Sequence, residues 1–233
     1  MEIPTTGDRG ILMMRAVIRN IVSHTYQPLL KRWLAKPRNY RYDDIRLRIA
    51  PGVFHPAFFT SSHLLMNYVL KGDIKNMLLL ELGAGAGLLS IRAAKLGARV
   101  VATDINPLSV QCLAANSIRN HTGLTLVESD LFDKIAPQQF DLIAINPPYY
   151  KKEPEQLNQY AWYCGNNGEY FQKLFRQIPA YVHENSRIVM VLCEACDLEM
   201  IRNFAEGVGF KMEQKLSRQS LIEKNFIFEF VRS

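Results

Sequence analysis

The sequence has no long hydrophobic run. None of its 233 residues belongs to an uninterrupted apolar stretch of the roughly 18 residues that a membrane-spanning helix requires. Arg15 and Arg19 interrupt the apolar residues near the N-terminus, so the pattern of a secretory signal peptide is also missing. These absences argue against a helical membrane protein and predict a cytoplasmic location.

Cysteine and histidine are scarce. The four cysteines are too few for a disulfide framework, and the CxxC pair Cys193 and Cys196 has no second pair to complete a zinc site. We interpret these two as reduced cysteines at the end of a strand. The five histidines show no metal-ligand spacing, so we expect no metal.

The glycine-rich segment 78–90, "LLLELGAGAGLLS", lacks the features of phosphate-binding loops. No Gly-Lys-Ser/Thr follows its glycines, which excludes a P-loop. Its third glycine, Gly87, comes one residue too early for the Gly-x-Gly-x-x-Gly pattern of NAD and flavin proteins. Glu81, immediately before the loop, would repel a diphosphate and suits a cationic ligand instead.

The chain has a hydrophobic content of 48%, which is enough for one globular domain. Its net charge is +6, and this charge is concentrated near the N-terminus. Residues 1–50 hold ten Lys/Arg against four Asp/Glu, which accounts for the whole net charge. We predict a basic helical extension and a leading strand at 1–50, followed by a domain at 51–233. Such an extension could attract RNA, DNA, a ribosome surface or an acidic membrane, or could simply be a solvated helix face.

Apolar strands alternate with amphipathic helices from residue 77 onward. This predicts an α/β fold in which helices cover both faces of a mostly parallel sheet, with an antiparallel hairpin at its C-terminal edge. The expected strands are 42–49, 77–82, 99–103, 124–128, 140–145, 187–192, 210–216 and 226–231. The expected helices are 11–35 (interrupted near Pro28), 61–70, 88–96, 107–119, 168–182 and 197–207.

Polar residues follow three of the expected strands. Glycines at 83, 85 and 87 allow a ligand to approach the backbone after the first strand, and Asp104 ends the next one, where a carboxylate can bind ribose hydroxyls. Asp130 follows the third strand and could accept a hydrogen bond from an adenine amino group, with Leu131 against the ring; a turn aspartate is the alternative. S-adenosylmethionine, a cationic nucleoside without phosphate, fits this set.

The segment "NPPY", residues 146–149, follows the strand expected at 140–145. Proline fixes φ and restricts the residue before it, so Asn146 and Pro147 should form a stiff, extended corner. Such a corner can hold a planar NH₂ group with two acceptors, the Asn146 side-chain oxygen and the Pro147 carbonyl. Tyr149 would supply a flat face for the group.

Together, E-L-G-A-G-A-G at 81–87, Asp104, S-D-L at 129–131 and N-P-P-Y at 146–149 resemble the class I S-adenosylmethionine-dependent methyltransferases over residues 50–233. The Asn-Pro-Pro-Tyr form implies methylation of a planar nitrogen in adenine, cytosine, guanine or glutamine. Segments 161–175 and 216–219 are similar to HemK-type protein-glutamine methyltransferases, in a branch that usually has a small zinc-binding partner protein.

The resemblance implies a Rossmann-like fold, S-adenosylmethionine converted to S-adenosylhomocysteine, and a glutamine-bearing protein loop as substrate. An exocyclic amino group of adenine or guanine in RNA or DNA is the alternative, which the basic extension favours. The implied catalytic residues are Asn146, Pro147, Pro148 and Tyr149. The implied cofactor-binding residues are Thr60, Glu81, Gly83, Ala84, Gly85, Gly87, Asp104, Ile105, Asp130, Leu131 and Asn146. Thr60 belongs to the poorest match, because Phe58 and Phe59 replace the family's acidic pair.

Overall fold

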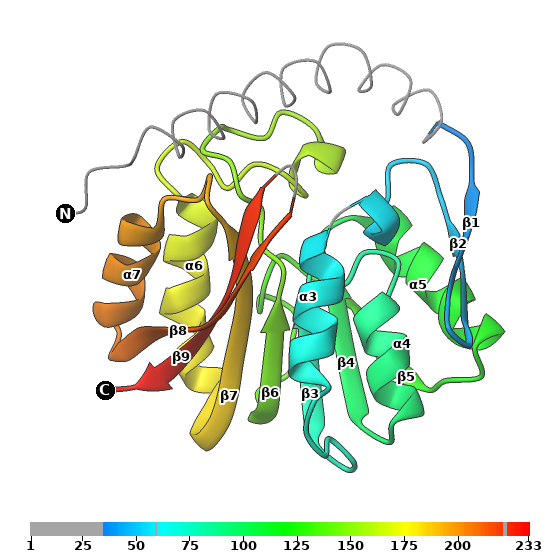
Figure 1. Ribbon diagram of the computed structural model, residues 1–233, viewed down its shortest axis with the longest axis horizontal. Coiled ribbons are helices and arrows are strands. Elements are labelled where there is room, and N and C mark those ends of the chain that lie inside the picture. The colour runs from blue at the N-terminus through cyan, green and yellow to red at the C-terminus, as the bar shows by residue number, and fades with distance from the viewer. Residues whose placement is uncertain (1–34, 59, 221–222) are drawn as a thin grey trace.

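The computed structural model describes residues 35–58, 60–220 and 223–233, and Figure 1 labels their strands and main helices. The strands are β1 (Arg38–Tyr42), β2 (Ile45–Ile49), β3 (Leu78–Leu82), β4 (Arg99–Asp104), β5 (Leu124–Glu128), β6 (Phe140–Ile145), β7 (Val182–Cys193), β8 (Phe210–Gln219) and β9 (Lys224–Arg232). The α-helices are α3 (Thr60–Val69), α4 (Leu88–Lys95), α5 (Pro107–Arg119), α6 (Glu169–Gln177) and α7 (Leu198–Glu206). Short 3₁₀ turns occupy Pro56–Phe58, Leu157–Gln159 and Ile178–Tyr181.

Seven strands form one sheet in the order β5-β4-β3-β6-β7-β9-β8. The five strands from β5 to β7 are parallel, whereas β9 pairs antiparallel with β7 and β8 antiparallel with β9. The predicted α/β fold, with its antiparallel hairpin at the C-terminal edge, is therefore confirmed. Because the order reverses between β3 and β6, the chain leaves a crevice at the carboxyl ends of these strands.

Alternate residues of the buried strands enter two separate cores. Leu79 joins the cluster under α3, α4 and α5, whereas the next residue, Leu80, joins the cluster under α6 and α7. Both side chains are fully buried. This is the period-2 alternation of a sheet covered on both faces, and Figure 1 shows the helices on its two sides.

The largest differences from the sequence predictions lie in two regions, at 38–49 and at 178–187. The strand expected at 42–49 is a hairpin, in which β1 pairs antiparallel with β2 across a turn at Asp43, a residue in the left-handed region at φ 48°. The helix expected at 168–182 ends at Gln177, and β7 begins at Val182 instead of residue 187. The earlier helix end is explained by Pro179, whose missing N–H and fixed φ do not suit a helix interior.

The leading hairpin packs on the sheet domain. Ile45, Leu47 and Ile49 point inward and join the core under α4 and α5. The helices predicted within 11–35 lie outside the described residues. No helix in the described ranges is both long and apolar enough to cross a membrane.

Candidate active site

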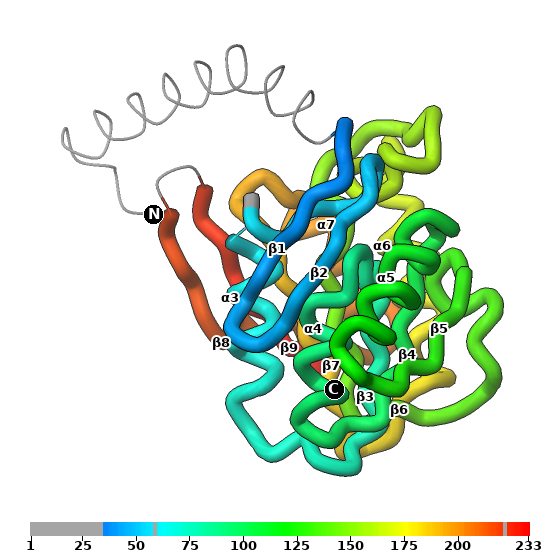
Figure 2. The backbone as a smooth tube through the Cα atoms, turned by 90° about the vertical axis from the view of Figure 1, so that its right-hand side faces the viewer, coloured from blue at the N-terminus to red at the C-terminus, as the bar shows by residue number. Residues whose placement is uncertain are grey.

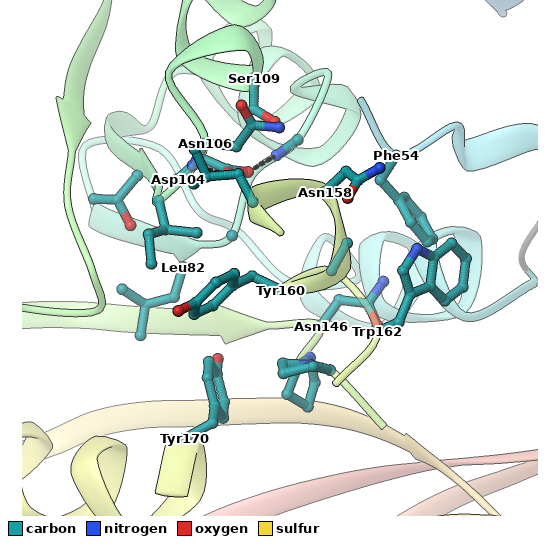
Figure 3. Close-up of a pocket in the computed structure, with 18 of the residues that line it drawn as sticks. Phe54, Leu82, Asp104, Asn106, Ser109, Asn146, Asn158, Tyr160, Trp162 and Tyr170 are labelled. Atoms are coloured by element: carbon teal, nitrogen blue, oxygen red, sulfur yellow. Dashed lines mark hydrogen bonds between the residues drawn. The ribbon is translucent and has the colours of Figure 1, made fainter. Parts of the chain in front are cut away.

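Two adjoining cavities open at the carboxyl ends of the parallel strands. The larger has a volume of about 150 Å³ and the smaller about 40 Å³. Phe54, Gly83, Gly85 and Asn146 line both cavities, so these four residues form the boundary between them. Figure 3 shows the larger cavity, with Asp104 and Leu82 on one side and Asn146 and Trp162 on another.

The structure brings nearly all the predicted site residues to these cavities. The larger one is lined by ten of them, namely Gly83, Gly85, Asp104, Ile105, Asp130, Leu131, Asn146, Pro147, Pro148 and Tyr149. The smaller one adds Glu81, Ala84 and Gly87. Thr60 lies at neither, because it starts α3 and its hydroxyl accepts a hydrogen bond from Asn225 Nδ2 at 3.2 Å. The next two residues, Ser61 and Ser62, line the larger and the smaller cavity instead.

The glycine loop turns between β3 and α4 with three residues in the left-handed region. The φ angles of Gly83, Gly85 and Gly87 are 72°, 54° and 87°. A Cβ at Gly83 would meet no atom within 4 Å, so the cavity reaches the bare backbone there. A Cβ at Gly87 would instead lie 1.9 Å from Cδ1 of Leu113 in α5. Gly83 therefore leaves room for a ligand, whereas Gly87 lets the loop pack against a helix.

Asp104, at the end of β4, fixes the glycine loop. Its Oδ2 accepts a hydrogen bond from the Gly85 amide at 2.9 Å, and its Oδ1 accepts one from the Asn106 amide at 2.8 Å. Burial raises the pKa of Asp104 above its usual value. A side-chain hydrogen bond with Ser109 also acts on the Asp104 carboxylate. No ion pair to Asp104 occurs within the described ranges, and its oxygens still have accepting capacity for a hydroxyl donor.

Glu81 is a buried carboxylate with only 9% of its surface exposed. Its Oε2 accepts hydrogen bonds from the amide of Ser90, at 2.9 Å, and from the Ser90 hydroxyl. Burial raises the pKa of Glu81 to about 7, against which the Ser90 hydrogen bonds act. Nothing in the described part of the chain pairs it with a cation, so a positively charged ligand would compensate its charge.

Asp130 and Leu131 follow β5 at the far wall of the larger cavity. The Oδ2 atom of Asp130 accepts a hydrogen bond from Lys173 Nζ at 2.6 Å, so this carboxylate is also tied to α6. Leu131 is buried and has a φ of 51°, which is unusual for a leucine. Since strained backbone tends to persist where a site needs it, the conformation of Leu131 supports its place in the ligand pocket.

The proline corner places Asn146 at the meeting point of the two cavities. Its Oδ1 accepts a hydrogen bond from the Tyr149 hydroxyl at 2.8 Å, and its Nδ2 lies 3.4 Å from Ser62 Oγ. Burial raises the pKa of Tyr149 well above its usual value, so the phenol stays protonated and donates. Because Pro147 and Pro148 are buried and their φ angles fixed, the carboxamide is held from both its backbone and its side chain.

Sequence reasoning missed the aromatic wall of the larger cavity. The chain returns to the corner after residue 150, where the amide of Tyr150 donates to the Trp162 carbonyl and the amide of Cys164 donates to the Tyr150 carbonyl. This loop brings Tyr160 and Trp162 to the cavity, and the ring centroids of Trp162 and Phe54 lie 5.6 Å apart. In Figure 3 the Tyr160 ring extends into the cavity between Leu82 and Tyr170. The only sequence signal was the aromatic content of residues 149–163.

A family model described as "Methyltransferase small domain" matches residues 44–225. The chain belongs to this family. Together with the methyltransferase relatives given below, this match makes the chain an S-adenosylmethionine-dependent methyltransferase.

Relatives with curated names agree with this assignment. The chain is 33% identical over 177 residues to "Putative protein N5-glutamine methyltransferase MJ0928" of Methanocaldococcus jannaschii. This alignment covers 73% of the chain and 87% of the relative. It is 28% identical over 165 residues to "Methyltransferase HEMK2" of Mus musculus, covering 66% of this chain and 77% of the relative. The resemblance to HemK-type enzymes is therefore confirmed.

Solved structures confirm the fold of this methyltransferase. A chain of the E. cuniculi Mtq2-Trm112 complex, which is responsible for the methylation of the translation termination factor eRF1, superposes with a TM-score of 0.61. The match covers 78% of this chain and 99% of that one at 21% identity. At this identity the likeness supports the class I methyltransferase sheet and nothing about substrate.

Proposed function

We propose that this methyltransferase transfers the methyl group of S-adenosylmethionine to the side-chain amide nitrogen of a glutamine in a protein. The observation that carries the proposal is the corner at 146–149, whose two prolines are buried and which holds one carboxamide, Asn146, where the two cavities meet. A rigid acceptor is what a glutamine amide needs, because its lone pair is delocalised and its NH₂ must be oriented for attack. The named glutamine methyltransferase relative supports the same substrate.

The residues around the cavities fit S-adenosylmethionine. The buried carboxylate of Glu81 and the half-buried one of Asp104 face the cavities without a cation from the described ranges, so an amino group and ribose hydroxyls would satisfy them. Leu131 and Tyr170 offer apolar walls for a purine ring, and Asp130 a polar edge. The cofactor supplies an electrophilic methyl group on its sulfonium and leaves as S-adenosylhomocysteine. Among the described residues no cluster of three or more metal-binding side chains occurs; the expectation of a metal-free reaction remains a prediction.

The corner residues orient the amide rather than remove its proton first. The Asn146 side-chain oxygen has a second lone pair beside the one that Tyr149 uses, and the Pro147 carbonyl is the other acceptor. Two acceptors hold both N–H bonds in one plane, which leaves the nitrogen lone pair perpendicular to that plane. The product nitrogen becomes acidic on alkylation, so no strong base is required and preorganisation supplies most of the rate.

The Tyr149 hydroxyl should matter for rate more than for binding. Tyr149→Phe removes the donor that holds Asn146 Oδ1 and keeps the ring, so we expect kcat to fall about tenfold with little change in substrate KM. Steady-state kinetics with labelled cofactor would measure both constants. A rise in KM at unchanged kcat would contradict this role and would assign Tyr149 to uniform substrate binding.

Glu81 should make cofactor affinity depend on pH. Its carboxylate must be ionised to attract the cationic amino group, and its pKa is raised to about 7, so affinity should fall up to about tenfold per unit below pH 7. Calorimetric titration with S-adenosylmethionine between pH 6 and 8 measures this slope. Glu81→Gln should bind more weakly and lose the Glu81 part of the slope, whereas the titration of the ligand itself affects both proteins equally. Parallel slopes for the two proteins would refute the assignment.

The same group has an opposite effect on the stability of the ligand-free protein. The pKa of Glu81 in the folded state lies above the usual value of 4.5, so the folded state binds more protons than the unfolded state between these values. The contribution of protonated Glu81 to stability is complete below pH 4.5 and is lost as the pH rises through about 7. Cofactor binding should therefore stabilise the protein most at the upper end of this range.

The substrate assignment is tested by methylation in cell extract. The extract is incubated with the enzyme and labelled S-adenosylmethionine, then divided between nuclease and protease. Label that survives nuclease but not protease supports a protein, and mass spectrometry then locates the methylated glutamine. Label lost to nuclease would replace the proposal with the alternative, an exocyclic amino group of RNA or DNA.

The proposal includes a cytoplasmic location and the possibility, tested in the same extract, that a small partner protein is needed for activity. Cofactor binding by the isolated chain without turnover of a purified substrate, followed by turnover of that same substrate when extract protein is added, would support such a partner. Turnover by the isolated chain on a purified substrate would argue against it.

A further inference from the structure

The outer face of the β1–β2 hairpin carries arginines that face one another. Arg41 and Arg46 are direct cross-strand partners, and Asn39 pairs with Arg48 in the same ladder. Arg41, Arg46 and Arg48 are exposed, whereas the alternate residues of β2 are buried in the core. Like charges directly opposite each other destabilise a hairpin, so this pair is not explained by the stability of the fold.

Helix α5 fixes this hairpin and adds a fourth arginine. Asn120 Oδ1 accepts from the Arg46 amide at 2.9 Å and its Nδ2 donates to the Arg46 carbonyl at 2.8 Å, while Asn116 Oδ1 accepts from the Arg48 amide at 2.8 Å. Arg119, exposed on the same helix, donates to Asn116 Oδ1 at 2.9 Å. Arg41, Arg46, Arg48 and Arg119, which we call the arginine face, are therefore carried by a rigid frame.

Acidic residues of the described ranges do not neutralise the arginine face. The two carboxylates of the hairpin turn, Asp43 and Asp44, point to other partners: Arg92 lies 2.8 Å and Lys95 2.8 Å from Asp44, and Arg92 lies 3.7 Å from Asp43. Within the part of the chain that the structure describes, no member of the arginine face forms an ion pair. The face is thus a concentrated positive surface that no carboxylate of the described residues compensates.

The arginine face leads directly to the active site. Arg48 lies four residues before Gly52, a distance of at most about 14 Å along an extended chain, and Gly52 and Phe54 line the larger cavity. The Gly52 carbonyl also lies 3.4 Å from Asn106 Nδ2, next to Asp104. Figure 2 shows the hairpin on the surface of the molecule, in front of the helices that it covers.

We propose that the arginine face binds the phosphate backbone of a nucleic-acid strand beside the methyl-transfer site. Guanidinium groups match phosphates with two parallel hydrogen bonds, and residues two apart on a strand repeat at roughly 6.6 Å, a spacing suited to successive phosphates. The outward positions of the hairpin carry no apolar side chain, whereas membrane-binding surfaces and the centres of protein interfaces need them. Beyond the proposed glutamine methylation, the enzyme would thus bind nucleic acid that lies near its substrate.

The test measures the salt dependence of binding. A fluorescent single-stranded RNA of 20 uridines, and the thymidine DNA of equal length, are titrated with the full chain between 50 and 200 mM KCl. Each phosphate contact contributes about 0.7 to the slope of log K against log salt. We expect Arg46→Gln and Arg48→Gln each to reduce the slope by about 0.7. Between 50 and 200 mM KCl the affinity of the double variant should therefore fall by a factor about sevenfold smaller than that of wild type.

Arg202→Gln is the matched control, because Arg202 is exposed on α7, away from the hairpin, and its loss removes the same charge. Its slope should equal that of wild type. Thermal stability of Arg46→Gln should be unchanged or higher, since the substitution removes the repulsion from Arg41. Comparison of the two oligomers tells whether the 2′-hydroxyl adds to the shared phosphate contact.

Three results would overturn the proposal: no binding of either oligomer, equal slopes for wild type and the Arg46 and Arg48 variants, or an equal reduction in Arg202→Gln. Anionic phosphatidylserine vesicles serve as a further probe. If the arginine variants lose binding to the vesicles but keep binding to the oligomers, the face would be assigned to a membrane. Glutamine methylation of a purified protein substrate by the Arg46 and Arg48 variants is measured in parallel. That activity tests the proposed function separately.

Discussion

Replacing Asn146 by alanine should reduce methyl transfer by about 10²–10³-fold, as the loss of a preorganised hydrogen-bonding group at a reacting centre commonly does. The side chain is held by Tyr149 and Ser62 and meets both cavities, so its removal takes away one of the two acceptors for the substrate NH₂. The loss should fall on kcat, with S-adenosylmethionine affinity changed less than tenfold. Initial rates with labelled cofactor and equilibrium binding would separate the two effects.

Two further variants complete this experiment. Asn146→Asp keeps acceptor oxygens but loses the amide donor to Ser62, so its rate should lie between those of wild type and Asn146→Ala. Asn185→Ala removes an exposed asparagine outside the site and should leave the rate unchanged. Turnover by the wild-type protein has to be established first. A rate for Asn146→Ala within threefold of wild type would show that the corner does not orient the substrate.

Gly87→Ala should destabilise the protein more than Gly83→Ala or Gly85→Ala. The left-handed φ of 87° costs an L-residue about 1–2 kcal/mol, and the contact of 1.9 Å with buried Leu113 adds overpacking of about 1–3 kcal/mol. We expect a loss of about 2–5 kcal/mol in the free energy of unfolding, measured by urea denaturation. Gly123→Ala, whose Cβ would meet no atom within 4 Å, is the control and should change stability by less than about 1 kcal/mol.

Gly83→Ala should separate binding from stability. Its φ of 72° carries a similar backbone strain of about 1–2 kcal/mol, but its Cβ would project into open space at the boundary of the two cavities. We expect cofactor affinity to fall about tenfold, equivalent to about 1.4 kcal/mol, with a smaller loss of stability than in Gly87→Ala. An unchanged dissociation constant in Gly83→Ala would contradict the placement of the cofactor against this backbone.

The order of strands and helices could be predicted because it is written in short-range patterns. The parallel strands are largely apolar, and Pro107 is typical of a first helical turn. The structure adds the cap of α5, where Asn106 Oδ1 accepts from the Leu108 amide at 3.0 Å. The hairpin at 38–49 was harder, because β1 has polar residues on both faces in the sequence and gains its partner only by pairing with β2. The end of α6 was missed because the helical spacing of apolar residues continues beyond Pro179 in the sequence.

The candidate site also combines parts that could be predicted from the sequence with parts that could not. The glycine loop, Asp104 and the proline corner were predicted because each is a local motif at the end of a strand, and parallel strands bring their carboxyl ends together. The aromatic wall was not, since Trp162 reaches the cavity through a loop whose only fixed points are the hydrogen bonds to Tyr150. Thr60 was expected at the cofactor, but α3 begins there and turns Ser61 and Ser62 toward the cavities instead.

The sequence by itself determined the α/β alternation, the positions of the carboxylates and the stiff corner at 146–149, because these follow from residue type, spacing and backbone restriction along the chain. Only the tertiary structure decided which groups share a site or a surface. Asn146 meets Ser62, Asp130 meets Lys173, and Arg41 faces Arg46 across a turn. The first two of these contacts join residues 84 and 43 positions apart, and all three depend on how strands pair and helices pack. Local periodicity carries no information on such contacts, since they form only when the sheet is assembled.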